Sequence, residues 1–190
     1  MTGHEGHPPV EDLPALEGDG LVPLAETRLV RPATAPPPRR IPSLYADPAS
    51  WAVLAAVDDL WARCPEAAQA PETTAMVLVS THGTADTMAG IARAAPGGRL
   101  SPMRFAGASA GGPISLVCMV HGLRGPTLVI TTDPADGLPA ARTMARHWLR
   151  TGAASHVVIA AHTHDPPRGH EVRCVVAGPA PDLRPPGTPW

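Results

Sequence analysis

The stretch that decides the fold is GLRGPTLVITTDPADG, residues 122–137. Its Leu128-Val129-Ile130 run is short, apolar and largely β-branched, which is typical of a strand covered on both faces. Asp133 suits the N-cap of a following helix, and Pro134 suits its first position, because the missing N–H would have no partner there. Asp136 places a carboxylate near the positive end of the helix dipole. The stretch therefore predicts a turn, a buried strand and the start of a helix.

Further strands and helices are expected on both sides of this stretch. Besides the strand at 127–132, we expect buried strands at residues 76–80, 157–161 and 171–177, and helices at residues 48–64, 86–94, 114–120 and 138–150. Asp47 is expected to cap the first of these helices, and the turn at residues 165–169 separates the last two strands. Strands that alternate with helices in this way predict an α/β fold, with a layered mixed β-sheet and helices.

Proline density divides the chain into three parts. Residues 1–40 are expected to form a proline-rich N-terminal tail or a segment draped over the domain, in which only Leu21 to Val30 could pair as an edge strand. Residues 41–178 are expected to form the α/β domain. Residues 179–190 are expected to be a proline-rich C-terminal tail.

The composition and charge of the chain exclude some classes of binding partner. The chain has 190 residues, 44% of them hydrophobic, and a net charge of −2, and its 15 basic residues are all arginine. Since no block of like charges occurs, we expect neither nucleic acid nor an acidic membrane surface as a partner. The residues at the N-terminus do not have the pattern of a secretory signal, so we expect none, and no apolar run approaches the roughly 18 residues of a membrane span. We therefore expect a cytoplasmic protein with no membrane contact.

Histidines form two short patterns. His82 follows the first buried strand of the domain, and His162-Thr163-His164 has an HxH spacing on another strand. Residues i and i+2 of a strand share a face, but the sequence identifies no third ligand for the HxH pair. His4 and His7 lie near a terminus and make a poor site without further ligands. We therefore expect no metal and no cofactor.

Several short motifs carry a family resemblance. They are Arg99-Leu100-Ser101-Pro102, Gly122-Leu123-Arg124-Gly125-Pro126, Ile130-Thr131-Thr132, Gly137 and Val157-Val158-Ile159-Ala160. Together they resemble the N-terminal half of a β-ketoacyl synthase of the thiolase fold, over residues 76–165. The resemblance implies half of a thiolase-like fold. The triplet His82-Gly83-Thr84 is similar to a histidine motif of the family, but it stands at a different place in the chain, so we interpret it as coincidence.

The resemblance also locates a missing nucleophile. In the family, a cysteine at the start of the helix after this strand carries the acyl group, and the helix dipole stabilises its thiolate. Pro134 stands at that position here. Proline has no nucleophilic side chain and no backbone N–H for an oxyanion hole. The family's two catalytic histidines belong to a C-terminal half that this chain is expected to lack, so we do not expect a competent ketosynthase.

Association is therefore the first functional hypothesis. Family dimers form partly by pairing the strand before the nucleophile with its copy, which predicts a dimer interface at Thr127, Leu128, Val129, Ile130, Thr131 and Thr132. We expect a non-catalytic ketosynthase-like protein of polyketide or related acyl-chain biosynthesis. Its expected partner is a second copy of the chain, a ketosynthase or chain-length factor, or an acyl carrier protein.

Two other interpretations remain open at this point. The first is a small acid/base enzyme, such as a dehydratase, isomerase or cyclase, that acts on a carrier-bound acyl chain. Its candidate catalytic residues are Asp133, Asp136, His82 and His162, because strand ends around the former nucleophile position could bring them together. Helix capping explains both aspartates without any catalytic role. The second is a degenerate remnant without function.

Overall fold

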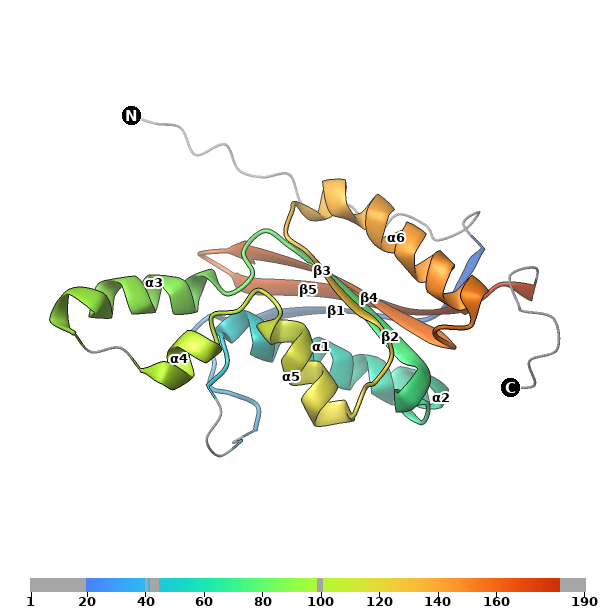
Figure 1. Cartoon of the computed structure of the whole chain (residues 1–190), viewed down its shortest axis with the longest axis horizontal. Helices are drawn as coiled ribbons and strands as arrows, with labels where there is room; N and C mark the ends of the chain where they lie inside the picture. Colours follow the sequence, from blue (N-terminus) through green and yellow to red (C-terminus); the bar gives the residue numbers. More distant parts are fainter. Residues whose placement is uncertain (1–19, 40, 42–44, 99–100, 182–190) are drawn as a thin grey trace.

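The computed structural model describes residues 20–39, 41, 45–98 and 101–181 (Figure 1). Their strands form one mixed sheet in the order β1-β5-β4-β2-β3. The strands are β1 (Leu21–Arg31), β2 (Thr74–Ser80), β3 (Thr127–Ile130), β4 (His156–Asp165) and β5 (Gly169–Pro179). β3, β2 and β4 run parallel, whereas β5 is antiparallel to both β4 and β1. This arrangement confirms the predicted α/β class with a mixed sheet.

Helices cover both faces of the sheet (Figure 1). α1 (Pro48–Arg63) and α5 (Gly112–His121) lie on one face, and α6 (Pro134–Thr151) lies on the other. We call these the α1 face and the α6 face. The remaining helical elements are α2 (Pro65–Ala68), α3 (Ala85–Ala94), α4 (Pro102–Ala106) and the 3-10 turns Pro71–Thr73 and Ala95–Gly97. α3 begins after β2 and projects past that end of the sheet.

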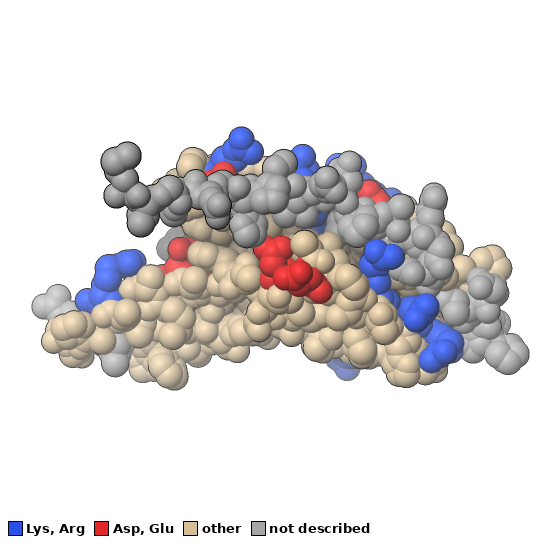
Figure 2. Space-filling model, turned by 90° about the horizontal axis from the view of Figure 1, so that it is seen from above, with Lys and Arg blue, Asp and Glu red and all other residues tan. Residues whose placement is uncertain are grey.

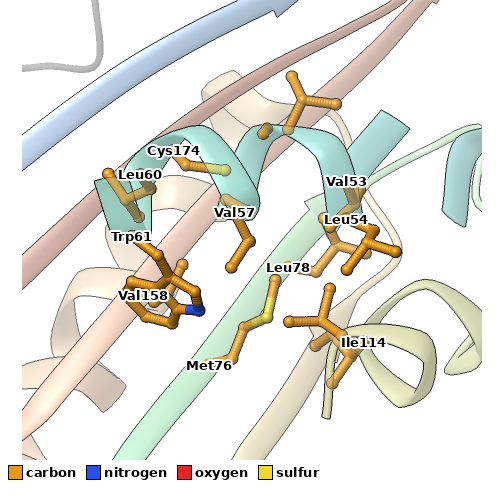
Figure 3. Close-up of a cluster of buried hydrophobic side chains, with 14 of the residues drawn as sticks. Val53, Leu54, Val57, Leu60, Trp61, Met76, Leu78, Ile114, Val158 and Cys174 are labelled. Carbon is orange, nitrogen blue, oxygen red and sulfur yellow. The ribbon is translucent and has the colours of Figure 1, made fainter. Parts of the chain in front are cut away.

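Each central strand divides its side chains between two hydrophobic cores. Met76 and Leu78 of β2 join the core under α1 and α5, whereas Val77 and Val79 join the core under α6. This alternation follows from the two-residue period of a strand, and it explains why every residue of β2 is buried. Figure 3 shows side chains of α1 such as Leu54 above Met76 and Leu78. The apolar strand sequences are therefore those of strands covered on both faces.

Part of the proline-rich N-terminal segment belongs to the sheet. β1 pairs with β5 as an edge strand, as predicted for Leu21 to Val30. Thr27 also donates a hydrogen bond to Asp59 of α1, which ties this strand to the helix. Most of the two predicted tails, residues 1–19 and 182–190, lies outside the described residues. The proposed division at residues 40 and 178 stays a prediction.

Charged side chains occur in small groups on the face shown in Figure 2. On the face seen from above in Figure 2, an acidic group lies near the middle, and arginines lie at both ends and along the upper edge of the view. Most of the described surface in this view is uncharged. Within the described ranges, no helix is both long enough and apolar enough to cross a membrane.

Candidate functional site

Polar residues continue the α1 face of the sheet beyond its hydrophobic core. On β4, Val158 and Ala160 belong to that core, and His162 and His164 follow at the same two-residue spacing. On β5, His170 precedes Val172 of the same core. Because side chains alternate along a strand, all three imidazoles lie on the α1 face. His164 and His170 are directly paired across the β4–β5 hairpin.

The start of α3 brings two more polar groups to these imidazoles. Nε2 of His82 lies 3.3 Å from Oδ2 of Asp86, and Nε2 of His170 lies 3.3 Å from the same oxygen. The His82 ring is centred 4.3 Å from the His164 ring. We call His82, Asp86, His162, His164 and His170 the histidine cluster. It joins the loop after β2, the first turn of α3, and both strands of the hairpin.

Two contacts hold the loop between β2 and α3 in place. Gly83 has a φ of +52°, in the left-handed region that favours glycine, and its N–H donates to Oγ of Ser80 at 2.9 Å. Asp47 is completely buried. Its carboxylate accepts the N–H of Ala49 at 2.8 Å and the N–H of Thr87 at 2.9 Å. Asp47 therefore joins the starts of α1 and α3 and positions Asp86, the neighbour of Thr87.

A chain of hydrogen bonds runs through the buried side of the cluster. Oγ of Ser80 lies 2.7 Å from Nδ1 of His162, and Nε2 of His162 lies 3.0 Å from Nδ1 of His170. Burial, together with neighbouring imidazoles, lowers the pKa of His162 to about 3 and the pKa of His170 to about 4. Burial also lowers the pKa of His164. These three imidazoles are therefore neutral at pH 7.

The cluster corrects the interpretation of the HxH pair. His82, Asp86, His164 and His170 each offer one ligand atom, and these atoms all lie within 4.8 Å of one another. The sequence alone identified no third ligand for this pair, because the groups beside His164 come from three other segments: the loop after β2, α3 and β5. One signal was available in the sequence: the predicted turn at residues 165–169 places His164 opposite His170 if the flanking strands form a hairpin.

The predicted acid/base residues fall into two groups. His82 and His162 both belong to the histidine cluster. Asp133 instead caps α6, where its carboxylate accepts the N–H of Ala135 at 2.9 Å, and Asp136 lies in the first turn of the same helix. Pro134 is the first residue of α6, as predicted. The two aspartates thus belong to the helix on the opposite face of the sheet from the cluster.

The predicted interface strand forms one edge of the sheet. β3 pairs only with β2 among the described strands, and it ends at Ile130, before Thr131 and Thr132. Thr127 is exposed, and the three residues from Leu128 to Ile130 are half-buried, although every residue of neighbouring β2 is buried. The strand was expected to be buried on both faces, but its position at the edge leaves it partly open. Its role as an interface stays a prediction.

An open, largely apolar cavity lies beside α4 and α5. It has a volume of about 310 Å³, and its lining includes Tyr45, Leu116, Met103 and Met119. The side chains of Met103 and Met119 are also among the exposed large apolar residues, as is Phe105 of α4. This surface is apolar, and the candidate residues Asp133, Asp136, His82 and His162 do not line the cavity.

Solved structures with a similar fold include ketosynthases and chain length factors. One is a chain from the complex of the ketosynthase ApeO with its chain length factor ApeC from Xenorhabdus doucetiae. It has a TM-score of 0.61 and 11% identity, over 84% of this chain and 79% of that chain. Another is the ishigamide ketosynthase/chain length factor, with a TM-score of 0.60 and 19% identity over 75% of this chain and 46% of that chain. A third is ketosynthase twelve of the bacillaene polyketide synthase from Bacillus amyloliquefaciens, with a TM-score of 0.55 and 12% identity over 72% of this chain and 29% of that chain.

These similarities establish a ketosynthase-like, thiolase-type fold. The chain spans less than half of the ishigamide and bacillaene chains. The match to the chain from the Xenorhabdus complex covers similar shares of both chains, 84% of this chain and 79% of that chain. These two chains are therefore similar in length. No protein-family model and no curated protein matches the sequence.

Proposed function

We propose that this chain is a non-catalytic ketosynthase-like protein of polyketide or related acyl-chain biosynthesis and that it acts by association. Its partner is a second copy of itself or a ketosynthase-type protein, with an acyl carrier protein as a further candidate. The observation that carries the proposal is the edge strand β3. Its Leu128-Val129-Ile130 run is half-buried, whereas the equally apolar β2 is fully buried.

An apolar strand at the edge of a sheet offers unpaired backbone groups to another chain. The register of β3 identifies these groups. Met76 is paired with Thr127, and its N–H donates to the carbonyl oxygen of Pro126 at 3.0 Å. In a parallel pair, the N–H groups of alternate residues point to opposite sides. The N–H of Leu128 therefore faces β2, and the N–H of Val129 faces away from the sheet, where a partner strand would accept it.

Pro134 supports the non-catalytic part of the proposal. It is buried at the first position of α6, where the resemblance to ketosynthases places the nucleophilic cysteine. Asp133 beside it accepts the N–H of Ala135, so the local structure is that of a stable helix start. The exposed Met103, Phe105 and Met119 add an apolar surface on α4 and α5 that a partner could cover.

The contacts of the histidine cluster favour association over the acid/base enzyme. A catalytic pair built at the former nucleophile position needs His82 or His162 near Asp133 or Asp136. Instead, His82 lies beside Asp86, and His162 lies between Ser80 and His170. The candidate acids and bases thus engage different partners, and Asp133 has a capping role.

Two substitutions at Val129 test the role of the edge strand. Val129→Pro removes the outward-facing N–H, which an edge strand tolerates on its own. Val129→Ala is the matched control, because it removes side-chain methyl groups but keeps the N–H. The measurements are the mass in solution by light scattering and the recovery of a co-expressed ketosynthase, chosen from the gene neighbourhood of this chain if one is encoded there.

We expect the wild type and Val129→Ala to form a dimer or a complex with the ketosynthase. Val129→Pro should be monomeric and should recover no ketosynthase, while its far-ultraviolet circular dichroism stays that of the wild type. A wild-type chain that is a stable monomer and recovers neither a ketosynthase nor an acyl carrier protein would contradict the proposal. Equal assembly of all three proteins would show that β3 is not the interface.

A further inference from the structure

Four side chains of the histidine cluster have the arrangement of a metal site. They come from three segments: His82 from the loop after β2, Asp86 from α3, and His164 and His170 from the β4–β5 hairpin. We propose that these four residues bind one divalent transition-metal ion of the zinc type. The ion would tie the start of α3 to the hairpin. This inference is independent of the proposed association.

The spacing of the ligand atoms agrees with tetrahedral coordination. With metal–ligand bonds of about 2.0–2.1 Å, the ligand atoms of a tetrahedral zinc site stand about 3.3 Å apart. Oδ2 of Asp86 lies 3.3 Å from Nε2 of His82 and 3.3 Å from Nε2 of His170. All four ligand atoms are within 4.8 Å of one another, so small side-chain movements would complete the site.

An unsatisfied buried atom points into the cluster. The side chain of His170 is 0% exposed, and its Nε2 makes no hydrogen bond with the described residues. A buried polar atom without a partner is costly, and it requires an explanation. Nε2 faces the carboxylate of Asp86, so an ion between them would satisfy the atom.

Ser80 and His162 provide the hydrogen bonds that commonly orient a metal-binding imidazole. When Nε2 of His170 binds the ion, its Nδ1 carries the proton and donates to Nε2 of His162, 3.0 Å away. Nδ1 of His162 then donates to Oγ of Ser80 at 2.7 Å. Partners of this kind fix the tautomer and the ring orientation of metal ligands. His162 is thus a positioning residue.

The donor set indicates which ions bind. Three imidazole nitrogens and one carboxylate oxygen suit Zn²⁺, Co²⁺ and Ni²⁺ better than Mg²⁺ or Ca²⁺, which prefer oxygen ligands. Four ligands from the protein are typical of a structural zinc site rather than of a catalytic one with an open position. The expected effect of the ion is therefore to stabilise the arrangement of α3 and the hairpin.

The test is metal binding by the full chain after treatment with a chelator. Zn²⁺ is titrated by calorimetry, and Co²⁺ is added as a spectroscopic probe, because tetrahedral Co²⁺ absorbs strongly in the visible range. We expect one ion per chain, a tetrahedral Co²⁺ spectrum and a higher melting temperature with Zn²⁺. His164→Ala and Asp86→Asn should each lower the affinity at least tenfold. Both side chains are partly exposed, so these variants should fold even if His170→Ala does not.

Control variants separate this site from the other histidines. His147→Ala on α6 and the double change His4→Ala with His7→Ala should bind Zn²⁺ as the wild type does. Ser80→Ala should lower the affinity by roughly tenfold or more if the hydrogen-bond chain positions His170. The proposal is overturned if Zn²⁺ binding is not saturable, if His164→Ala binds as tightly as the wild type, or if the His4 and His7 double variant abolishes binding.

Discussion

Asp47 illustrates how one buried side chain organises the site. The sequence predicts its role as the N-cap of α1, and the hydrogen bond to Ala49 confirms it. Its second hydrogen bond, to Thr87, joins residues 40 positions apart in the sequence. No local pattern predicts that bond, because it depends on how α3 returns to the start of α1. This bond sets the position of Asp86 relative to the hairpin.

Replacing Asp47 should therefore cost more than replacing an ordinary cap. Asp47→Ala leaves two buried N–H groups without an acceptor, and we expect the free energy of unfolding to fall by about 2–4 kcal/mol. Asp133→Ala is the comparison, since Asp133 caps α6 in a more exposed position, and a loss of about 1 kcal/mol is expected there. Urea denaturation of both variants measures the difference. Equal losses would mean that the bond to Thr87 contributes little.

At the scale of elements, the contact between α6 and the sheet depends on the absence of one side chain. A Cβ atom at Gly137 would lie 2.4 Å from Cγ1 of Val79 and 2.9 Å from Cγ2 of Thr132. The helix can approach β2 and β3 this closely only with glycine. The sequence predicts the start of α6 from Asp133 and Pro134, but it does not reveal this close approach, because the neighbours of Gly137 lie on other elements.

Two glycine substitutions test this packing. Gly137→Ala should lower the free energy of unfolding by about 1–3 kcal/mol, because the added methyl group overlaps buried β-branched side chains. Gly90→Ala in α3 is the matched control, since its Cβ would meet only Nη1 of Arg104 at 3.8 Å. Alanine favours the helical backbone, so Gly90→Ala should raise the free energy of unfolding by about 0.5–1 kcal/mol. If Gly137→Ala were also stabilising, the helix would not be in close contact with the sheet.

At the scale of the whole molecule, the sheet has two edges of different character. β1 forms one edge beside β5 and has many exposed residues, whereas the Leu128-Val129-Ile130 run of β3 at the other edge is apolar and half-buried. The class of the fold is predicted by the alternation of strands and helices. The strand order is not predicted by this alternation, because pairing between strands distant in the sequence depends on the packing of both cores. The sequence nevertheless identified β3, the strand at the partly open edge, as the one on which the association hypothesis depends.

The position of Pro134 leads to a prediction for the purified chain of 190 residues. Pro134→Cys places a thiol at the start of α6, where the helix dipole favours the thiolate. The variant should still show no condensation of acyl thioesters, because the two catalytic histidines that the ketosynthase resemblance requires belong to another half of that fold. Product formation is measured by mass spectrometry of a carrier protein loaded with substrate. Any condensation product formed by this variant alone would contradict the prediction.

The sequence by itself determined the local features of this protein: the buried strands, the capped starts of α1 and α6, and the turn of the β4–β5 hairpin. These features depend on residue spacing and backbone chemistry within a few positions. Only the tertiary structure decided that His82 and Asp86 meet His164 and His170, and that β3 forms an edge. Both outcomes depend on parallel pairing between segments far apart in the chain, such as Ser80 and His162, which are 82 positions apart. No local pattern encodes such pairing, since it is selected by the burial of both faces of the sheet at once.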